Sequence, residues 1–216
     1  MEQQQSKHLV ITIGRTYGSG GREIGRRVAQ QLGIPFYDNE LIAMAAEKAG
    51  VHPDIAAKSE EHATSGMLFG MPNGNLPIQA PSLGAMTTPL TDRVFFAQSD
   101  IIRGLADKED CVIIGRCADY VLREYENVIK VFIHADAETC VARCVRYYGL
   151  DEATARKRIR KVDQQRAGYY TYYSGQKWGS KQSYDLLLDT GRFGVDGCAA
   201  IICAAAEAAR AGKSEE

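Results

Sequence analysis

Residues 10–32, VITIGRTYGSGGREIGRRVAQQL, constrain the fold of this chain more than any other stretch. The stretch begins with β-branched residues that suit a buried strand, crosses a glycine cluster, and continues with apolar residues at helical spacing. A glycine-rich turn between a strand and a helix lets backbone N–H groups converge on an anion, and the helix dipole adds to the attraction. The pattern therefore predicts a strand, a helix and, between them, a phosphate-binding loop with Gly18, Ser19, Gly20 and Gly21.

The loop departs from the common phosphate-loop pattern G-x-x-x-x-G-K-[ST]. When GSGG is placed on that pattern, Arg15 stands at the first glycine, Gly21 at the lysine and Arg22 at the hydroxyl residue. Arg22 can offer its guanidinium to the β- and γ-phosphates of a nucleotide, although a planar fork differs from the point charge of lysine. The alternative is a glycine-rich turn in which Arg22 and Arg26 are merely solvated.

Length and charge limit the kinds of protein that this chain can be. With 216 residues, 45 % hydrophobic and 25 % charged, it can bury the core of one α/β domain with a modest insertion. A net charge of −1 gives no electrostatic reason to expect a nucleic acid or an anionic membrane as partner. No apolar run reaches the roughly 20 residues of a membrane span, and the polar opening lacks the apolar core of a signal peptide. We therefore expect a soluble, cytoplasmic protein.

The cysteines and histidines show no metal-ligand spacing. The six cysteines contain no C-x-x-C pair, and each lies among apolar residues, which is typical of buried reduced thiols. The four histidines are scattered along the chain. We therefore expect no zinc site and no protein-held metal centre.

Two charged residues follow predicted strands and should meet at the carboxyl edge of a parallel sheet, where open α/β folds bind ligands. Asp38 ends the short strand FYD and is a candidate substrate contact, or else the N-cap of a helix over about 39–49. Arg116 follows the buried strand 111–114 and is a candidate anion contact. Its alternative role is an ion pair with Asp119 or Glu124.

Residues 64–91 carry no charged side chain and are dense in Gly, Pro, Met, Ser and Thr. Disordered segments favour charge and avoid apolar residues, so we expect a long loop with apolar anchors of its own. It either covers a ligand or packs against a second subunit. Elsewhere, apolar spacing predicts helices over 92–106 and 195–209 and strands over 127–134 and 184–189. It also predicts a helix that is capped by Asp136, runs through Tyr148 and stops at Gly149.

The segment DEATARKRIRKVDQQR, residues 151–166, predicts a helix with a narrow apolar stripe and a dense basic face. Such runs are often only solvated surfaces. In a nearly neutral protein, however, six cations within eleven residues favour a lid helix that closes over polyphosphate, with Asp163 placed to orient one of them. The tyrosine-rich stretch GYYTYYSGQKWG that follows either stacks on a base, packs the lid on the body, or forms a dimer contact.

Four features stand in a characteristic order: the glycine loop, FYD after the first helix, a strand ending in GR, and an arginine-rich helix before a final LLLD strand. Together they resemble the bacterial cytidylate kinases of the P-loop nucleoside monophosphate kinase family, and in particular a cytidylate-kinase-like branch whose loop reads GSGGREIG. The resemblance covers residues 10–202 and implies a three-layer α/β P-loop NTPase fold, with a mostly parallel central sheet flanked by helices. We expect one domain over residues 1–216, with an acceptor-side flap near 50–95 and a lid near 151–180.

The resemblance also implies roles for single residues. The loop from Gly18 to Glu23 would hold the phosphates of ATP, and Arg116 would match the arginine of the family's GRD motif, which contacts the phosphate of CMP. Asp163 and Arg166 would match the lid pattern D-x-x-R, with Asp163 on the nucleoside and Arg166 on a phosphate.

This sequence departs from the family pattern at three positions. Gly21 replaces the loop lysine, Cys117 replaces the aspartate of GRD, and Ile159 stands where the first lid arginine belongs, so Arg158 or Arg160 would substitute for it. These departures bear on CMP specificity and on activity itself.

We therefore expect ATP-dependent phosphoryl transfer with Mg²⁺ to a nucleoside monophosphate, CMP or dCMP, in a chain that either acts alone or forms a homodimer. Arg22 is the first candidate for the missing lysine, and Glu23 is a weaker candidate for a contact to the metal. The alternatives are a kinase for another small acceptor and a nucleotide-binding regulatory protein without turnover.

Overall fold

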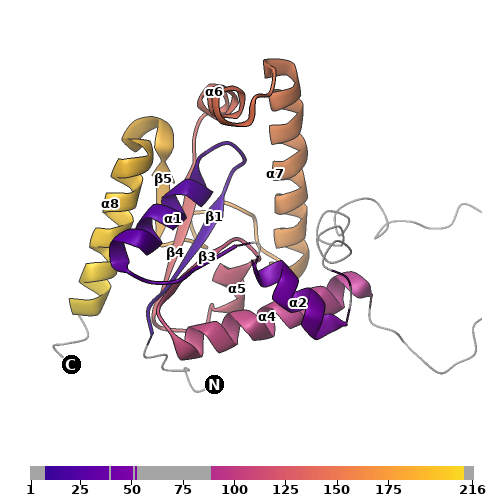
Figure 1. Cartoon of the computed structure of the whole chain (residues 1–216), viewed down its shortest axis with the longest axis vertical. Helices are drawn as coiled ribbons and strands as arrows, with labels where there is room; N and C mark the ends of the chain where they lie inside the picture. Colours follow the sequence, from indigo (N-terminus) through magenta and orange to yellow (C-terminus); the bar gives the residue numbers. More distant parts are fainter. Residues whose placement is uncertain (1–7, 39, 51, 53–88, 212–216) are drawn as a thin grey trace, which may run out of the picture.

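The fold is built on a five-stranded sheet in which every pair of neighbouring strands is parallel (Figure 1). In the computed structural model, residues 8–38, 40–50, 52 and 89–211 are described. The strand order is β2-β3-β1-β4-β5. The bounds are β1 Val10–Arg15, β2 Phe36–Tyr37, β3 Cys111–Ile114, β4 Val128–His134 and β5 Leu186–Asp189.

Helices connect the strands and cover both faces of the sheet (Figure 1). Their bounds are α1 Gly21–Leu32, α2 Glu40–Ala49, α4 Leu90–Lys108, α5 Ala118–Val121, α6 Ala137–Tyr148, α7 Glu152–Ser174 and α8 Thr190–Ala211. None of the helices in the described part of the chain combines the length and the apolar character that a bilayer crossing needs. The predicted flap near 50–95 lies largely outside the described residues, which resume at Pro89.

The alternation of side chains along the strands divides the core into two halves. Ile11, Ile13 and Ile114 point to one face, where they pack against α1 and α8. Val10 and Ile113 point to the other face, where they pack against α4 and α5. Strands buried on both sides are typical of parallel sheets, and the arrangement is a three-layer α/β/α sandwich.

Local capping signals explain where two helices near the site begin. The carboxylate of Asp136 accepts a hydrogen bond from Thr139 N at 2.8 Å, and α6 ends at Gly149 with a positive φ of 64°. Asp151 accepts from Thr154 N at 2.9 Å at the start of α7. The predicted capping of α6 by Asp136 and its termination at Gly149 are therefore confirmed.

Helix α7 is longer than the sequence pattern suggested, because it continues through the tyrosine-rich stretch to Ser174. Tyr173 stacks on Phe95 of α4 at 3.8 Å between ring centroids, and its hydroxyl donates to Asp92. The Tyr170 hydroxyl donates to the buried carboxylate of Asp119 at 2.7 Å. Of the alternatives for these tyrosines, the structure shows packing of α7 on the body of the domain for Tyr170 and Tyr173.

Candidate functional site

The glycine loop, residues 15–21, joins the end of β1 to the start of α1 at the carboxyl edge of the sheet. Gly18 and Gly20 adopt φ values of +83° and +84°, which side chains with a Cβ rarely accept. A Cβ atom on Gly18 would also lie 2.7 Å from the carbonyl oxygen of Cys140. The loop therefore needs glycine at position 18 both for its turn and for its contact with α6.

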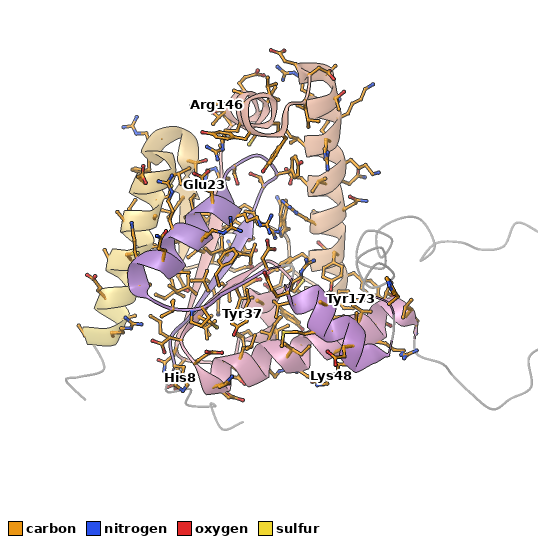
Figure 2. The ribbon with its side chains drawn as sticks, viewed as in Figure 1. His8, Glu23, Tyr37, Lys48, Arg146 and Tyr173 are labelled. Carbon is orange, nitrogen blue, oxygen red and sulfur yellow. The ribbon has the colours of Figure 1, made fainter. Side chains whose placement is uncertain are left out.

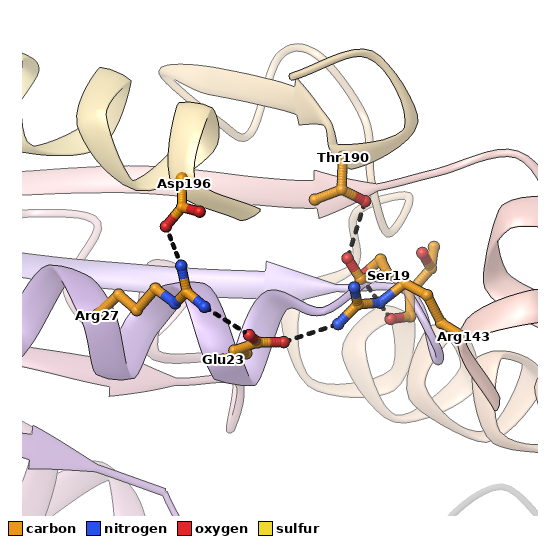
Figure 3. Close-up of polar contacts among 7 residues, drawn as sticks. Ser19, Glu23, Arg27, Arg143, Thr190 and Asp196 are labelled. Carbon is orange, nitrogen blue, oxygen red and sulfur yellow. Dashed lines mark hydrogen bonds and ion pairs between the residues drawn. The ribbon is translucent and has the colours of Figure 1, made fainter. Parts of the chain in front are cut away.

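The first turn of α1 offers backbone N–H groups at the mouth of this loop. Its N-cap is Gly20, which has no side chain to cap them. Two hydroxyls hold the loop in shape: Ser19 Oγ donates to Thr16 O at 2.8 Å, and Thr190 Oγ1 donates to Ser19 O at 2.8 Å (Figure 3). A helix N-terminus in such a turn is a common anion-binding geometry.

Glu23 lies in a chain of ion pairs on the outer side of α1 (Figures 2 and 3). Its two carboxylate oxygens accept from Arg143 Nη2 at 2.8 Å and from Arg27 Nη2 at 3.0 Å. Arg27 in turn pairs with Asp196 of α8. The expected contact of Glu23 with ATP stays a prediction, but this carboxylate already has two cationic partners.

Arg22 and Asp38, both predicted site residues, contact each other. Arg22 Nε lies 2.5 Å from Asp38 Oδ2, and the carboxylate is buried while the arginine side chain is 54 % exposed. Asp38 N donates to Glu40 Oε2. The carboxylate of Asp38 thus faces the site, where it neutralises one arginine.

Three further arginines converge behind the loop from different elements: Arg15 ends β1, Arg116 follows β3, and Arg166 lies on α7. Burial is the main cause that lowers the pKa of each of the three guanidinium groups, and for Arg15 repulsion from Arg166 and Arg116 adds to it. We call these residues together with Arg22 the arginine cluster. The lowered pKa values mean that burial disfavours the charged forms of Arg15, Arg116 and Arg166.

Helix α7 touches the glycine loop directly. Asp163 Oδ1 accepts a hydrogen bond from Tyr17 N at 2.7 Å, and Arg166 Nη1 donates to Arg15 O at 3.0 Å. The two side chains also form an ion pair at 3.8 Å. The two residues of the D-x-x-R pattern therefore lie against the loop that they were predicted to close over.

Asp119 and Glu124 are the two carboxylates that the sequence offered as ion-pair partners of Arg116, and each of them binds another side chain. Asp119 accepts from Tyr170, and Glu124 pairs with Arg123 Nε at 3.3 Å. Arg158 and Arg160 are both exposed on α7, and the Cζ atom of Arg158 lies 5.7 Å from the centroid of the Tyr17 ring. Arg158 thus lies beside a residue of the glycine loop.

Sequence reasoning missed three residues that shape the site. Thr190 binds the loop carbonyl of Ser19, and Arg143 lies on the loop at Gly20, where a Cβ atom would come within 2.8 Å of Nη2. Arg15 was noted only as the residue at the first glycine of the pattern. Only Arg15 left a signal in the sequence, because a charged residue at the end of a buried strand needs a reason to be there.

Burial raises the pKa of Asp163 from 3.8 to about 6, and the hydrogen bond from Tyr17 N and the nearby Arg166 oppose this shift. Because the folded protein holds this proton more tightly than the unfolded chain, Asp163 makes stability fall as the pH rises through about 4 to 6. Asp163→Asn removes the ionisation and keeps an acceptor oxygen. We expect the free energy of unfolding of this variant, relative to wild type, to increase by about 1–2 kcal/mol between pH 4.5 and 7.5.

Urea unfolding at the two pH values measures this difference. Asp151→Asn is the matched control at the start of the same helix, because hydrogen bonds from Thr154 lower the pKa of Asp151. Asp151 is therefore ionised in the folded and the unfolded chain at both pH values, and its replacement should give almost no difference between them. If both variants changed equally in unfolding free energy between the two pH values, Asp163 would not be a buried carboxyl group with a raised pKa.

The carboxylates beside the loop are already engaged with other groups and do not fit the ligand set of a resident Mg²⁺ ion. Glu23, Asp38 and Asp163 already bind guanidinium groups or a backbone amide. In the part of the chain that the structure describes, no group of three or more His, Cys, Asp or Glu side chains is placed to hold a metal ion. Mg²⁺ that enters the site with ATP would therefore be bound by phosphate oxygens and water.

A glycine loop before a helix N-terminus, at the carboxyl edge of a five-stranded parallel sheet, places this chain in the class of P-loop α/β folds. Two solved structures share the fold: shikimate kinase from Bacteroides thetaiotaomicron, with a TM-score of 0.53 and 13 % identity over 92 % of this chain and 98 % of that one, and a gluconokinase from Sinorhizobium meliloti, with a TM-score of 0.51 and 16 % identity over 97 % and 95 %. The predicted fold class is therefore confirmed.

The model of the cytidylate kinase-like family matches residues 10–192, and this chain belongs to that family. Cytidylate kinases from Methanopyrus kandleri and Archaeoglobus fulgidus are each 26 % identical, over 91 % and 92 % of this chain and 92 % and 95 % of their own lengths. An uncharacterized protein from Eubacterium ventriosum has a TM-score of 0.68 and 27 % identity over 93 % of this chain and 99 % of that one. The family predicted from the sequence is thus shown.

Proposed function

We propose that this protein transfers the γ-phosphoryl group of MgATP to a nucleoside monophosphate, with CMP or dCMP as the first candidates. The observation that carries the proposal is the convergence of Arg116 and Arg166 on a glycine loop that presents the N-terminus of α1. The family match and the names of the 26 % identical relatives support a nucleotide as acceptor. At this identity, the choice of base is the weaker part of the proposal.

Such a site performs phosphoryl transfer mainly by positioning and by neutralising charge. The amides of residues 18–23 hold the phosphates of the donor, as backbone N–H groups do at other helix N-termini. Arg116 and Arg166 bind the acceptor phosphate and bring two polyanions together that would otherwise repel. Asp163 contacts the nucleoside when the acceptor is bound, and the helix that carries it excludes water from the transferred group.

The other expectations remain predictions. They are a lid over residues 151–180, a flap near 50–95, a homodimer, a cytoplasmic location, and catalytic roles for Arg22, Arg158 and Arg160.

Initial rates with MgATP and a panel of acceptors test the proposed function. The panel contains CMP, dCMP, UMP, AMP and GMP, together with shikimate and gluconate. We expect the highest kcat/KM with CMP or dCMP. Turnover of shikimate or gluconate alone would replace the proposal by a kinase for another small acceptor. Tight ATP binding without turnover of any acceptor would favour a regulatory protein.

A further inference from the structure

The side chain of Arg15 lies across the glycine loop, from the first turn of α1 to the end of β3. A Cβ atom built on Gly21 would lie 2.5 Å from Cβ and 3.0 Å from Cγ of Arg15, and one built on Gly115 would collide with Arg15 Nη1. Two glycines therefore leave the room that this side chain occupies, one beside its stem and one beside its guanidinium.

Arg15 and Gly21 are consequently a reciprocal pair. A lysine at position 21, as the common pattern has it, would place its Cβ where the stem of Arg15 now lies. A glycine at position 15, also as in the common pattern, would remove that stem. The two departures from the pattern thus compensate sterically, and a cation has moved from the first residue of α1 to the last residue of β1.

Arg22 is a poorer substitute for the lysine. Its guanidinium binds the buried carboxylate of Asp38, and its side chain is 54 % exposed. Among the described residues, by contrast, no carboxylate lies within ion-pair distance of Arg15, and its strongest charged neighbours are Arg166 and Arg116. A bound polyanion therefore stabilises a cation in such surroundings more than it stabilises a cation that already has a carboxylate partner.

We propose that Arg15 supplies the phosphate-binding cation that the loop lysine supplies in the common pattern, and that Gly21 is glycine to make room for it. That the bound phosphate is the γ-phosphate of ATP rests on the proposed function. Because its guanidinium lies against Gly115, beside Arg116 and Arg166, Arg15 stands where the transferred group meets the acceptor. The guanidinium fork can there bind oxygens of both phosphates.

Calorimetric titration with inorganic tripolyphosphate and with ATP tests the proposal without any acceptor. We expect Arg15→Ala to weaken the binding of both by about 10- to 100-fold, the range for a lost charged hydrogen bond. Arg22→Ala should weaken it less, by at most about threefold. Arg146→Ala, on the exposed side of α6, is the matched control and should bind as wild type does.

The reciprocal pair gives a second test that does not depend on the stability of a single variant. Gly21→Lys in the wild-type chain should lower the melting temperature, because the new Cβ meets the stem of Arg15. In the Arg15→Gly chain, the same Gly21→Lys change should instead be tolerated and recover at least tenfold in tripolyphosphate affinity. A double-mutant cycle measures this coupling.

The outcomes separate the proposal from the proposed function. Loss of tripolyphosphate binding in Arg15→Ala with retained binding in Arg22→Ala supports the role of Arg15, even if no acceptor in the panel is phosphorylated. A larger loss for Arg22→Ala, additive effects of Arg15→Gly and Gly21→Lys, or a wild-type protein that binds no tripolyphosphate would each overturn it.

Discussion

Replacing Arg166 with alanine is expected to lower kcat/KM on the order of 10³-fold for the acceptor that wild type prefers. Arg166 Nη1 donates to Arg15 O in the glycine loop, and its partner Asp163 accepts from Tyr17 N, so the side chain lies where α7 meets the loop. Its removal takes a positive charge from the place where the proposed reaction brings phosphates together. Steady-state rates with MgATP as the fixed substrate measure the loss.

Two further variants on α7 make this prediction specific. Arg166→Lys keeps the charge without the fork and should recover only part of the rate. Arg156→Ala removes an arginine of the same helix that pairs with Glu138 on α6 at 2.7 Å, and we expect a change of less than about threefold. Equal losses in Arg156→Ala and Arg166→Ala would indicate that the helix acts only through its overall charge.

Gly25→Val is expected to destabilise the protein by about 3 kcal/mol, the upper part of the range for added volume in a packed core. Gly25 lies on the buried face of α1, where a Cβ atom would meet Ile114 Cδ1 at 2.6 Å and the side chains of Ile13 and Phe36 at 3.1 Å. The helix must move away from the sheet to admit the side chain. Thermal unfolding should show a decrease in Tm of roughly 6–12 °C.

Gly104→Ala is the matched control for this change. Gly104 is exposed on α4, and a Cβ atom there would meet no atom within 4 Å. Alanine should therefore stabilise the helix by about 0.5–1 kcal/mol, because only the backbone entropy changes. A decrease in Tm of similar size in both variants would show that the close approach at Gly25 is not the cause.

The sequence alone predicted the parts of the fold that depend on local pattern. The apolar runs and the glycine cluster of residues 10–32 indicated β1, the loop and α1, and Asp136 and Gly149 marked both ends of α6. The non-helical angles of Gly194 likewise lie directly before the predicted start of the last helix at residue 195. Local signals failed where tertiary contacts extend an element: helix α7 continues through its tyrosines, which pack on α4.

For the site, the sequence by itself determined which residue types reach the carboxyl edge of the sheet. A loop after β1, Asp38 after β2 and Arg116 after β3 follow from strand order and parallel direction alone. Only the tertiary structure decided how their charges are shared. Three contacts depend on packing and on side-chain direction, which a spacing pattern does not contain. They join Tyr17 to Asp163, Arg22 to Asp38, and Arg15 to Gly21. For that reason the sequence pointed to Arg22 as the substitute for the lysine, while the packing of the loop points to Arg15.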